Sequence, residues 1–320
     1  MRGKLISDNK QVFDIEVTDK DPDNALCPLC SHLRQKHSRE KCLNINKAMR
    51  VARCNHCGVG FKFVFEYEFR AGVTTDHITT KDLVDPTGNL LQYVINDRKI
   101  SANTLISCSV KMAHRKIKDK KTDQFVERLC IAFVYTENGI PRMIKFRDKY
   151  KNFAIEKGSR LIFYGLDWIK NEKECVIVEG EFDRLAYHQV GITSVVSVPN
   201  GVTLSQEEKD HFEKTGQMVI TSAINMKYLD THMSWFDNKE KIYLATDTDA
   251  AGLKLREEFI RRFGKGRCSI INFSTWSHPD HLRGCKDAND VLIHHGPEAL
   301  KETLKQAKPL PLDDVVHFRI

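Results

Sequence analysis

The chain has 320 residues, of which 41% are hydrophobic and 29% charged, and a net charge of +7. This length is expected to give about two globular domains, each with its own hydrophobic core. No segment approaches the ~18 consecutive apolar residues of a membrane-spanning helix, and residues 1–11 contain no apolar run of the kind found in signal peptides. We therefore expect neither a membrane anchor nor secretion.

The first predicted unit, residues 1–67, contains two Cys-x-x-Cys pairs separated by 23 residues, Cys27 with Cys30 and Cys54 with Cys57. Two such pairs can place four thiolates in a tetrahedron, the geometry that a structural Zn²⁺ prefers. The alternative, buried or redox-active thiols, is less consistent with paired turns. The other six cysteines are scattered along a long chain, which favours a reducing compartment over a disulfide framework. They are Cys42, Cys108, Cys130, Cys175, Cys268 and Cys285.

A basic segment lies between the two cysteine pairs, since residues 31–53 hold seven Lys/Arg and one Glu. Such a segment is typical of a surface for phosphate-bearing partners, although a solvated lysine-rich face is the alternative. After it, Phe61, Phe63 and Phe65 alternate, which predicts the core face of a strand more than a base-stacking platform. We expect His32 and His37 on the surface and not as metal ligands. The basic residues are Arg34, Lys36, Arg39, Lys41, Lys47, Arg50 and Arg53.

Residues 68–94 are mixed and polar, with a turn signal at residues 85–88, and are predicted to be a linker leading into a helical region. A second basic segment follows, because residues 111–151 hold twelve Lys/Arg against five Asp/Glu. Within it, residues 129–135 and 140–146 have strand patterns on either side of Glu137-Asn138-Gly139, which predicts a β-hairpin.

From Cys175 onward, short apolar strands alternate with helical stretches, so we predict a mostly parallel sheet with helices packed on it. Ligands of such sheets bind beyond the carboxyl ends of the strands. The predicted strands are residues 175–178, 194–198, 242–245 and 269–273. The predicted helices are residues 182–189, 205–214 and 253–263.

Acidic clusters follow three of these strands, at residues 179–183, 247–249 and 286–290. Carboxylates gathered at one edge of a sheet repel one another unless cations bridge them, and such oxygen ligands suit Mg²⁺. Paired Mg²⁺ ions can stabilise both the attacking and the leaving oxygen of a phosphoryl transfer. For a single cluster the simpler alternative is a helix cap or first-turn acid, which applies to Asp249 and Glu181.

Taken together, three sequences resemble the Toprim signature of bacterial primases, type IA and type II topoisomerases and some nucleases. They are Glu179-Gly180-Glu181-x-Asp183, Asp247-x-Asp249-x-x-Gly252 and Lys286-Asp287-Ala288-Asn289. With the upstream cysteine pairs, the arrangement resembles the primase half of phage T7-type primase-helicases and Twinkle-like proteins, over roughly residues 25–305. Residues 144–153, a basic strand, and the loop 197–201 are also similar to that group.

This resemblance implies an α/β fold in which a small β zinc ribbon precedes a Toprim-type, mostly parallel sheet with flanking helices. Residues 95–174 would form the basic N-terminal part of an RNA polymerase domain, 175–308 the Toprim core, and 309–320 a tail or linker. Glu179 would be the metal-linked catalytic carboxylate or general base. Asp247, Asp249 and Asp287 would share the binding of Mg²⁺ or Mn²⁺ with it, and Asp247 and Asp249 would also be catalytic. Nucleotide and primer binding would fall to Lys145, Arg147, Lys149 and Lys151, whose alternation in a strand predicts one shared face.

The function implied is that of a DNA primase, which makes short RNA primers on single-stranded DNA from ribonucleoside triphosphates, with the ribbon selecting the start site. We expect a cytoplasmic protein, bacterial or acting in a phage host, that works with a replicative helicase. The GxxxxGK[ST] loop of a helicase does not occur in this sequence, so the helicase would be fused in a longer protein or separate. The alternatives are a Toprim nuclease and a non-catalytic DNA-binding or helicase-loading module; a type IA topoisomerase would need a larger body.

Overall fold

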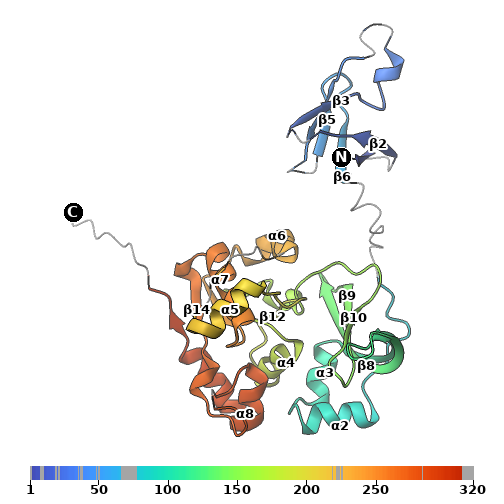
Figure 1. The fold of residues 1–320 in the computed structure, drawn as a ribbon. Helices are drawn as coiled ribbons and strands as arrows, with labels where there is room; N and C mark the ends of the chain where they lie inside the picture. Colours follow the sequence, from blue (N-terminus) through green and yellow to red (C-terminus); the bar gives the residue numbers. More distant parts are fainter. Residues whose placement is uncertain are drawn as a thin grey trace, which may run out of the picture. The chain divides into compact units, whose positions relative to one another are not determined.

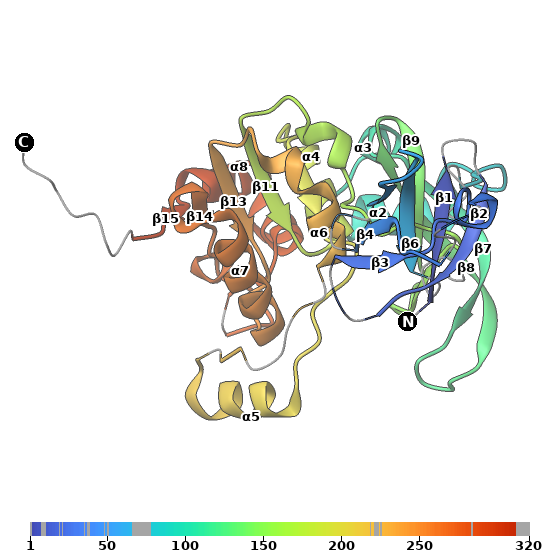
Figure 2. The same cartoon turned by 90° about the horizontal axis from the view of Figure 1, so that it is seen from above.

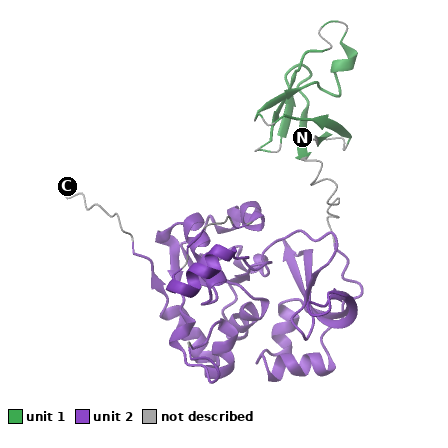
Figure 3. Ribbon diagram, in the orientation of Figure 1, with its two compact units in different colours: residues 1–75 green, residues 76–320 purple. Residues whose placement is uncertain are grey.

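The computed structural model describes residues 2–7, 11–18, 20, 22–34, 36, 39–47, 49, 51–65, 78–217, 219–220, 224, 226–282 and 284–311. The chain divides into two compact units, Met1–Thr75 and Asp76–Ile320, shown in separate colours in Figure 3. Residues 312–320, which are most of the predicted tail, and residues 66–77, which include the start of the predicted linker, lie outside the described residues, as do His37 and Arg50. The helical region expected after the linker begins at Gly88, within the range given to the linker.

The first unit is one antiparallel sheet of six strands in the order β2-β1-β6-β5-β4-β3. Its core contains the side chains of Phe61 and Phe63, so the predicted core face of that strand is confirmed for these two residues. The elements are β1 Arg2–Ser7, β2 Val12–Glu16, β3 Asp23–Ala25, the 3-10 helix η1 Ser31–Leu33, β4 Leu43–Asn46, β5 Val51–Cys54 and β6 Gly60–Phe65.

The second unit begins with two helices and an antiparallel sheet in the order β10-β9-β8-β7. The predicted hairpin is confirmed: Asn138 and Gly139 connect β8 to β9 with φ values of 53° and 74°, as a tight hairpin turn requires. The elements are α2 Gly88–Asn96, α3 Ala102–Ser107, β7 Val110–Lys118, β8 Phe125–Glu137, β9 Ile140–Arg147 and β10 Phe153–Ile155.

The prediction that Lys145, Arg147, Lys149 and Lys151 alternate along a single strand is wrong for the last two. Strand β9 ends at Arg147, and residues 148–152 form the turn to β10, in which Lys151 has a φ of 62°. Asp148 causes this turn, because its carboxylate accepts hydrogen bonds from the backbone N–H groups of Tyr150 and Asn152. An Asp that binds its own following backbone competes with strand pairing.

The remaining chain forms the predicted parallel sheet, in the order β12-β11-β13-β14-β15, with only β15 antiparallel to its neighbour (Figures 1 and 2). Strand β14 is shorter than predicted, because Phe273 belongs to a 3-10 helix and not to the strand. The strands are β11 Glu174–Val178, β12 Val195–Ser197, β13 Lys241–Ala245, β14 Cys268–Ile270 and β15 Lys308–Pro309. The helices are η2 Leu166–Ile169, α4 Glu181–Gln189, α5 Gln206–Thr215, α6 Lys227–His232, η3 Met233–Phe236, α7 Ala250–Phe263, η4 Lys265–Arg267, η5 Phe273–Thr275 and α8 Ala288–Lys305.

Both faces of this sheet are buried at β11 and β13, so these two strands are apolar after their first residue. Val176 and Val178 belong to the core formed with α4, α8 and the strand β8 of the antiparallel sheet. Cys175 and Ile177 belong to the core on the other face, formed with α6 and α7. In Figure 2, α7 lies on one side of β13 and α4 on the other. The shared core with β8 joins the two sheets into a single unit. Among the described residues, no helix is long and apolar enough to cross a membrane.

Candidate active site and metal centres

The four cysteines of the two Cys-x-x-Cys pairs come together in the first unit, with all four Sγ atoms within 4.8 Å of one another. The Sγ atoms of Cys27 and Cys57 are 3.8 Å apart, and those of Cys30 and Cys54 are 3.6 Å apart. Burial would raise the pKa of Cys54, but the backbone N–H groups of Cys57 and His56 lower it below its ordinary value. The four thiols therefore fit a closed, four-thiolate zinc site.

Cys42 is a fifth cysteine beside this cluster, and sequence reasoning placed it among the scattered ones. Its Sγ lies 3.5 Å from the Sγ of Cys54 and 3.9 Å from the Oγ of Ser31. Arg34 also donates to it. Spacing along the chain gave no signal of this, because Cys42 reaches the cluster through the pairing of β4 with β5.

The second group of interest is an acidic cleft at the carboxyl ends of β11 and β13, where a cavity of about 550 Å³ opens. Glu179 follows β11 and Asp247 follows β13, while Asp287 is the N-cap residue of α8. The lining residues are Arg98, Lys145, Arg147, Lys151, Phe153, Glu179, Gly180, Glu181, Phe182, Asp183, Pro199, Asn200, Gly201, Asp247, His281, Lys286, Asp287, Asn289 and Asp290.

Within the cleft, carboxylate oxygens of Asp183, Asp247 and Asp287 lie within 4.8 Å of one another. The set predicted to hold Mg²⁺ was Glu179, Asp247, Asp249 and Asp287, so the structure adds Asp183 to the convergent group. Glu179 also lines the cleft, and its Oε1 accepts the backbone N–H of Asp247 at 2.9 Å. Asp183 lies four residues after Glu179, on the first turn of α4. The sequence signal that could have identified it is its place in the Glu179-Gly180-Glu181-x-Asp183 sequence.

Asp249 has a different position from the one expected. Its carboxylate caps α7 by accepting the N–H of Gly252 at 3.0 Å, which is the helix-cap alternative given above. It is absent from the cleft lining, whereas Asp247, two residues earlier, faces the cleft. Asp249 still repels Glu179 and contributes to raising its pKa.

Two of the three convergent carboxylates are held in place by backbone N–H groups. Asp183 accepts from Gly180 N at 3.2 Å and from Asn289 N at 3.0 Å, which ties α4 to α8. Asp287 accepts from Asp290 N at 2.8 Å. These bonds fix the directions of the Asp183 and Asp287 side chains, as a precise metal site requires.

Crowding and burial make the charged forms of these groups costly. Burial and the neighbouring acids raise the pKa of Glu179 to about 7 and that of Asp247 to about 8. The pKa values of Asp183 and Asp287 are raised by the same two causes. Buried like charges at one position indicate that a cation belongs there. Because the donor atoms are carboxylate oxygens, the group fits a hard divalent cation such as Mg²⁺ or Mn²⁺.

Gly252 allows α7 to approach this site closely. A Cβ atom added at this position would lie 2.2 Å from the carbonyl oxygen of Asp247 and 2.5 Å from Oε1 of Glu179. No side chain fits there, so the glycine of the Asp247-x-Asp249-x-x-Gly252 sequence is required by the packing of the helix against the two acids.

The cationic side of the cleft comes from the antiparallel sheet. Lys145 Nζ lies 2.6 Å from Oε1 of Glu181 and 3.0 Å from the carbonyl oxygen of Pro199. Glu181 also accepts from the hydroxyl of Tyr135 and is buried, so it positions Lys145 and does not serve as a helix cap. Arg147 and Lys151 line the cleft as well, but Lys149 does not.

Comparison with known proteins gives the class of the second unit. Residues 176–292, which contain most of the parallel sheet, match the family described as Toprim-like. This confirms the predicted fold class for the region that contains the acidic cleft.

The similar proteins fit the same class. The chain is 33% identical over 240 residues to the "Primase homolog protein" of Arabidopsis thaliana, covering 75% of this chain and 64% of that protein. It is 34% identical over 193 residues to the "Twinkle homolog protein, chloroplastic/mitochondrial" of the same plant, covering 60% and 26%. It is 29% identical over 184 residues to the "DNA helicase/primase" of Enterobacteria phage T3, covering 56% and 27%. The chain thus spans less than two thirds of the length of each relative, and the resemblance to Toprim-type primases is confirmed.

Proposed function

We propose that this protein is a DNA primase that synthesises short RNA primers on a single-stranded DNA template from ribonucleoside triphosphates. One observation carries the proposal: carboxylate oxygens of Asp183, Asp247 and Asp287 lie within 4.8 Å of one another, in a cleft that Lys145 and Arg147 also line. Convergent acids beside cations suit a reaction in which a metal-bound triphosphate is attacked. The names of the relatives support the same activity.

The divalent cation, Mg²⁺ or Mn²⁺, would be held by Asp183, Asp247 and Asp287 and would offset the negative charge that develops on the transferred phosphate. The residues of the chain supply the remaining functions. Arg147 and Lys151 bind the triphosphate, and Lys145 contributes a positive charge beside Glu181. Glu179, with a pKa of about 7, accepts the proton of the attacking 3′-hydroxyl at Oε2, because Oε1 already binds the N–H of Asp247.

The first unit would bind one structural zinc through Cys27, Cys30, Cys54 and Cys57 and select the start site on the template. A four-thiolate site has no open position for chemistry, so its zinc stabilises the ribbon. Thiolates bind zinc only while reduced, which supports the expected reducing compartment. A helicase is the proposed partner, either in the same longer protein or separate, because two relatives with longer chains carry the names Twinkle homolog and helicase/primase.

The test is a primer-synthesis assay on a library of randomised single-stranded templates, with Mg²⁺ and labelled ribonucleotides. We expect short, template-dependent RNA whose start sites share a sequence. Shortening of labelled template without RNA synthesis would instead favour the nuclease alternative, and binding with neither reaction would favour the non-catalytic module. Asp287→Asn is the matched control, because asparagine keeps the cap of α8 while removing the charge.

A further inference from the structure

A thiol outside the two Cys-x-x-Cys pairs lies against the four-cysteine cluster of the first unit. The Sγ of Cys42 is 3.5 Å from the Sγ of Cys54, as close as Cys54 is to Cys30 within the cluster, at 3.6 Å. Cys42 does not belong to the group of four sulfurs that lie within 4.8 Å of one another. A four-thiolate site is complete without it. Zinc binding therefore does not account for the position of Cys42.

The backbone holds Cys42 and Cys54 next to each other. Leu43 and Cys54 are opposite each other in the antiparallel pair of β4 and β5. The N–H of Asn55 donates to the carbonyl oxygen of Cys42 at 2.8 Å, so the chain before Leu43 stays beside the chain after Cys54. A disulfide needs two sulfurs at about 2.05 Å on α-carbons about 4.4–6.8 Å apart. Adjacent antiparallel strands bring α-carbons into this range, so a bond between the two sulfurs requires mainly side-chain movement.

Two hydrogen-bond donors surround the sulfur of Cys42. The Nη2 of Arg34 lies 3.4 Å from it and also donates to the Oγ of Ser31 at 2.9 Å. The Oγ of Ser31 is 3.9 Å from the same sulfur. The same Nη2 donates to the carbonyl oxygen of Glu40 at 3.1 Å, which holds the guanidinium in this place. An oxygen atom added to the sulfur of Cys42 would therefore meet a guanidinium and a hydroxyl that can donate to it.

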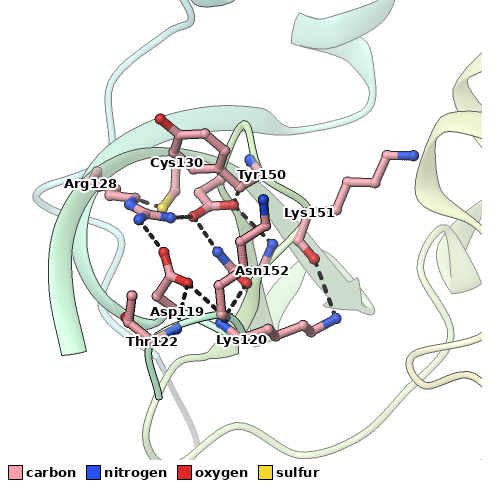
Figure 4. Close-up of polar contacts among 10 residues, drawn as sticks. Asp119, Lys120, Thr122, Arg128, Cys130, Tyr150, Lys151 and Asn152 are labelled. Atoms are coloured by element: carbon pink, nitrogen blue, oxygen red, sulfur yellow. Dashed lines mark hydrogen bonds and ion pairs between the residues drawn. The ribbon is translucent and has the colours of Figure 1, made fainter. Parts of the chain in front are cut away.

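Access to solvent distinguishes Cys42 from the cysteines of the second unit. Cys42 is half-buried, whereas the five cysteines of that unit are all buried. Cys130, labelled in Figure 4, is one of them, and its Sγ donates to the carbonyl oxygen of Arg128 at 3.4 Å. The others are Cys108, Cys175, Cys268 and Cys285.

Within the first unit, Cys57 is exposed as well, but it is one of the four proposed zinc ligands. A bound metal lowers the basicity of a thiolate, and nucleophilicity falls with basicity. Of the ten cysteines, all of which the structure describes, only Cys42 is both accessible and outside the cluster and the core. An accessible thiol with a second thiol beside it is the arrangement found in redox-sensing cysteines.

We propose that Cys42 is an oxidation site that controls the zinc site of the first unit: a hydroperoxide converts its thiol to a sulfenic acid, and Cys54 then forms a disulfide with it. With hydrogen peroxide, the O–O bond breaks in the first step, the sulfur of Cys42 takes one oxygen atom, and water leaves. In the second step, the thiolate of Cys54 attacks the sulfur of Cys42, the S–O bond breaks, and hydroxide leaves. Each sulfur loses one electron, and the peroxide takes up both.

The disulfide removes one of the four zinc ligands. The sulfur of Cys54 then has no thiolate charge to offer to a metal, and three thiolates remain, those of Cys27, Cys30 and Cys57. A structural site that loses a ligand loses most of its affinity, and the fold that depends on the metal is lost with it. A thiol reductant restores both sulfurs. Oxidation would thus stop the start-site selection proposed for the first unit and leave the acidic cleft intact.

The inference rests on the zinc site of the proposed function, so zinc content is measured first on the reduced 320-residue chain. We expect one equivalent in the wild type and in Cys42→Ser, because Cys42 lies outside the convergent set. A reduced wild type without zinc would contradict the zinc site and this inference together. A zinc-loaded protein that fails the two tests below would contradict the inference alone.

Zinc release is then followed with a metallochromic dye after hydrogen peroxide is added. We expect Cys42→Ser to release zinc about tenfold more slowly than the wild type, because oxidation must then begin at a metal-bound sulfur of lower nucleophilicity. Cys42→Ala should behave in the same way, which separates loss of the thiol from any effect of the serine hydroxyl. Release by both variants at the wild-type rate would overturn the proposal.

The bond itself is identified by mass spectrometry of the wild type, which needs no variant. The protein is alkylated before zinc release is complete and is digested with trypsin, which separates residues 42–47 from residues 54–62. We expect these two peptides to be joined, with fragmentation placing the bond on Cys54 and not on Cys57. A first disulfide within either Cys-x-x-Cys pair would refute the role of Cys42. Dithiothreitol with added zinc should restore one equivalent of bound metal, and failure to do so would rule out a reversible control.

Discussion

The two candidate metal centres of this protein differ in donor atoms, in enclosure and in how the chain builds them. In the four-cysteine cluster, Cys27, Cys30 and Cys54 are all buried, and their sulfur atoms surround one point. In the acidic cleft, the convergent oxygens line an open cavity of about 550 Å³. A closed set of soft donors stabilises a fold, while an open set of hard donors leaves coordination positions for a substrate. The comparison therefore separates a structural metal from a catalytic one.

The two centres also depend on different lengths of chain. The cysteines come from two turns of one small sheet, and their pairs follow each other closely in sequence. The acidic cleft needs α4 and α8 to meet, through the bond from Asn289 N to Asp183 across 106 positions. Loss of a ligand should thus unfold a local unit in the first case and remove activity from a folded protein in the second.

The largest effect is expected for Cys54→Ser. Structural zinc sites contribute about 10–16 kcal/mol of apparent binding free energy, so the variant should lose its zinc and unfold the first unit. Calorimetry should show the second unit melting as in the wild type. Cys42→Ser is the matched control, because its sulfur lies near Cys54 but outside the convergent set. Zinc retained by Cys54→Ser and lost by Cys42→Ser would reverse the ligand assignment.

The next largest effect is expected for one of two aspartates that each cap a helix, Asp287 at α8 and Asp249 at α7. Asp287→Asn should lower primer synthesis about a thousandfold or more, because a catalytic cation contributes several kcal/mol to transition-state stabilisation. Asp249→Asn should leave most of the activity, since asparagine caps α7 as well as aspartate does. Single-turnover assays at saturating Mg²⁺ measure both. A similar loss in the two variants would return Asp249 to the metal-binding set predicted from the sequence.

A smaller effect on stability is expected at the ion pair between Lys145 and Glu181. Lys145→Met leaves the buried carboxylate of Glu181 without its cation and should lower the free energy of unfolding of the second unit by about 3 kcal/mol. Urea unfolding measures this, and adding Glu181→Gln should recover part of the loss. Lys149→Met, on the exposed turn, is the control. A Lys145→Met protein as stable as that control would show that Glu181 does not need the ion pair.

The smallest effect is expected in the turn of residues 148–152, between β9 and β10. Lys149→Ala should weaken binding of single-stranded DNA slightly and similarly for different sequences. It should also reduce the slope of log affinity against log salt concentration by about 1, as expected when one phosphate contact is lost. An unchanged slope would show that Lys149 does not contact phosphate.

Much of the fold could be predicted because local patterns determine it. Glu137-Asn138-Gly139 predicts the β8–β9 hairpin, since the turn needs two residues with positive φ. The apolar strands of the parallel sheet could be recognised because both of their faces are buried. The cysteine pairs indicated a metal site through spacing alone. In each case, neighbouring residues carry the information.

What could not be predicted depends on contacts between distant segments or on the direction of a single side chain. Asp183 stood in the signature sequence but not in the predicted metal-binding set, and a hydrogen bond from α8 holds its carboxylate in the cleft. Asp249 has the right spacing from Asp247, but its carboxylate caps α7. Lys149 and Lys151 continue an alternating pattern that Asp148 interrupts by binding the backbone after it.

Gly252 is a position at which this protein tolerates little change. The missing side chain leaves space that the carbonyl group of Asp247 and the carboxylate of Glu179 already occupy. Even one methyl group there would force α7 away from the sheet and separate the two acids that follow β11 and β13. A residue that performs no chemistry thus limits the site, and random mutagenesis should find fewer accepted substitutions at residue 252 than at Asp249.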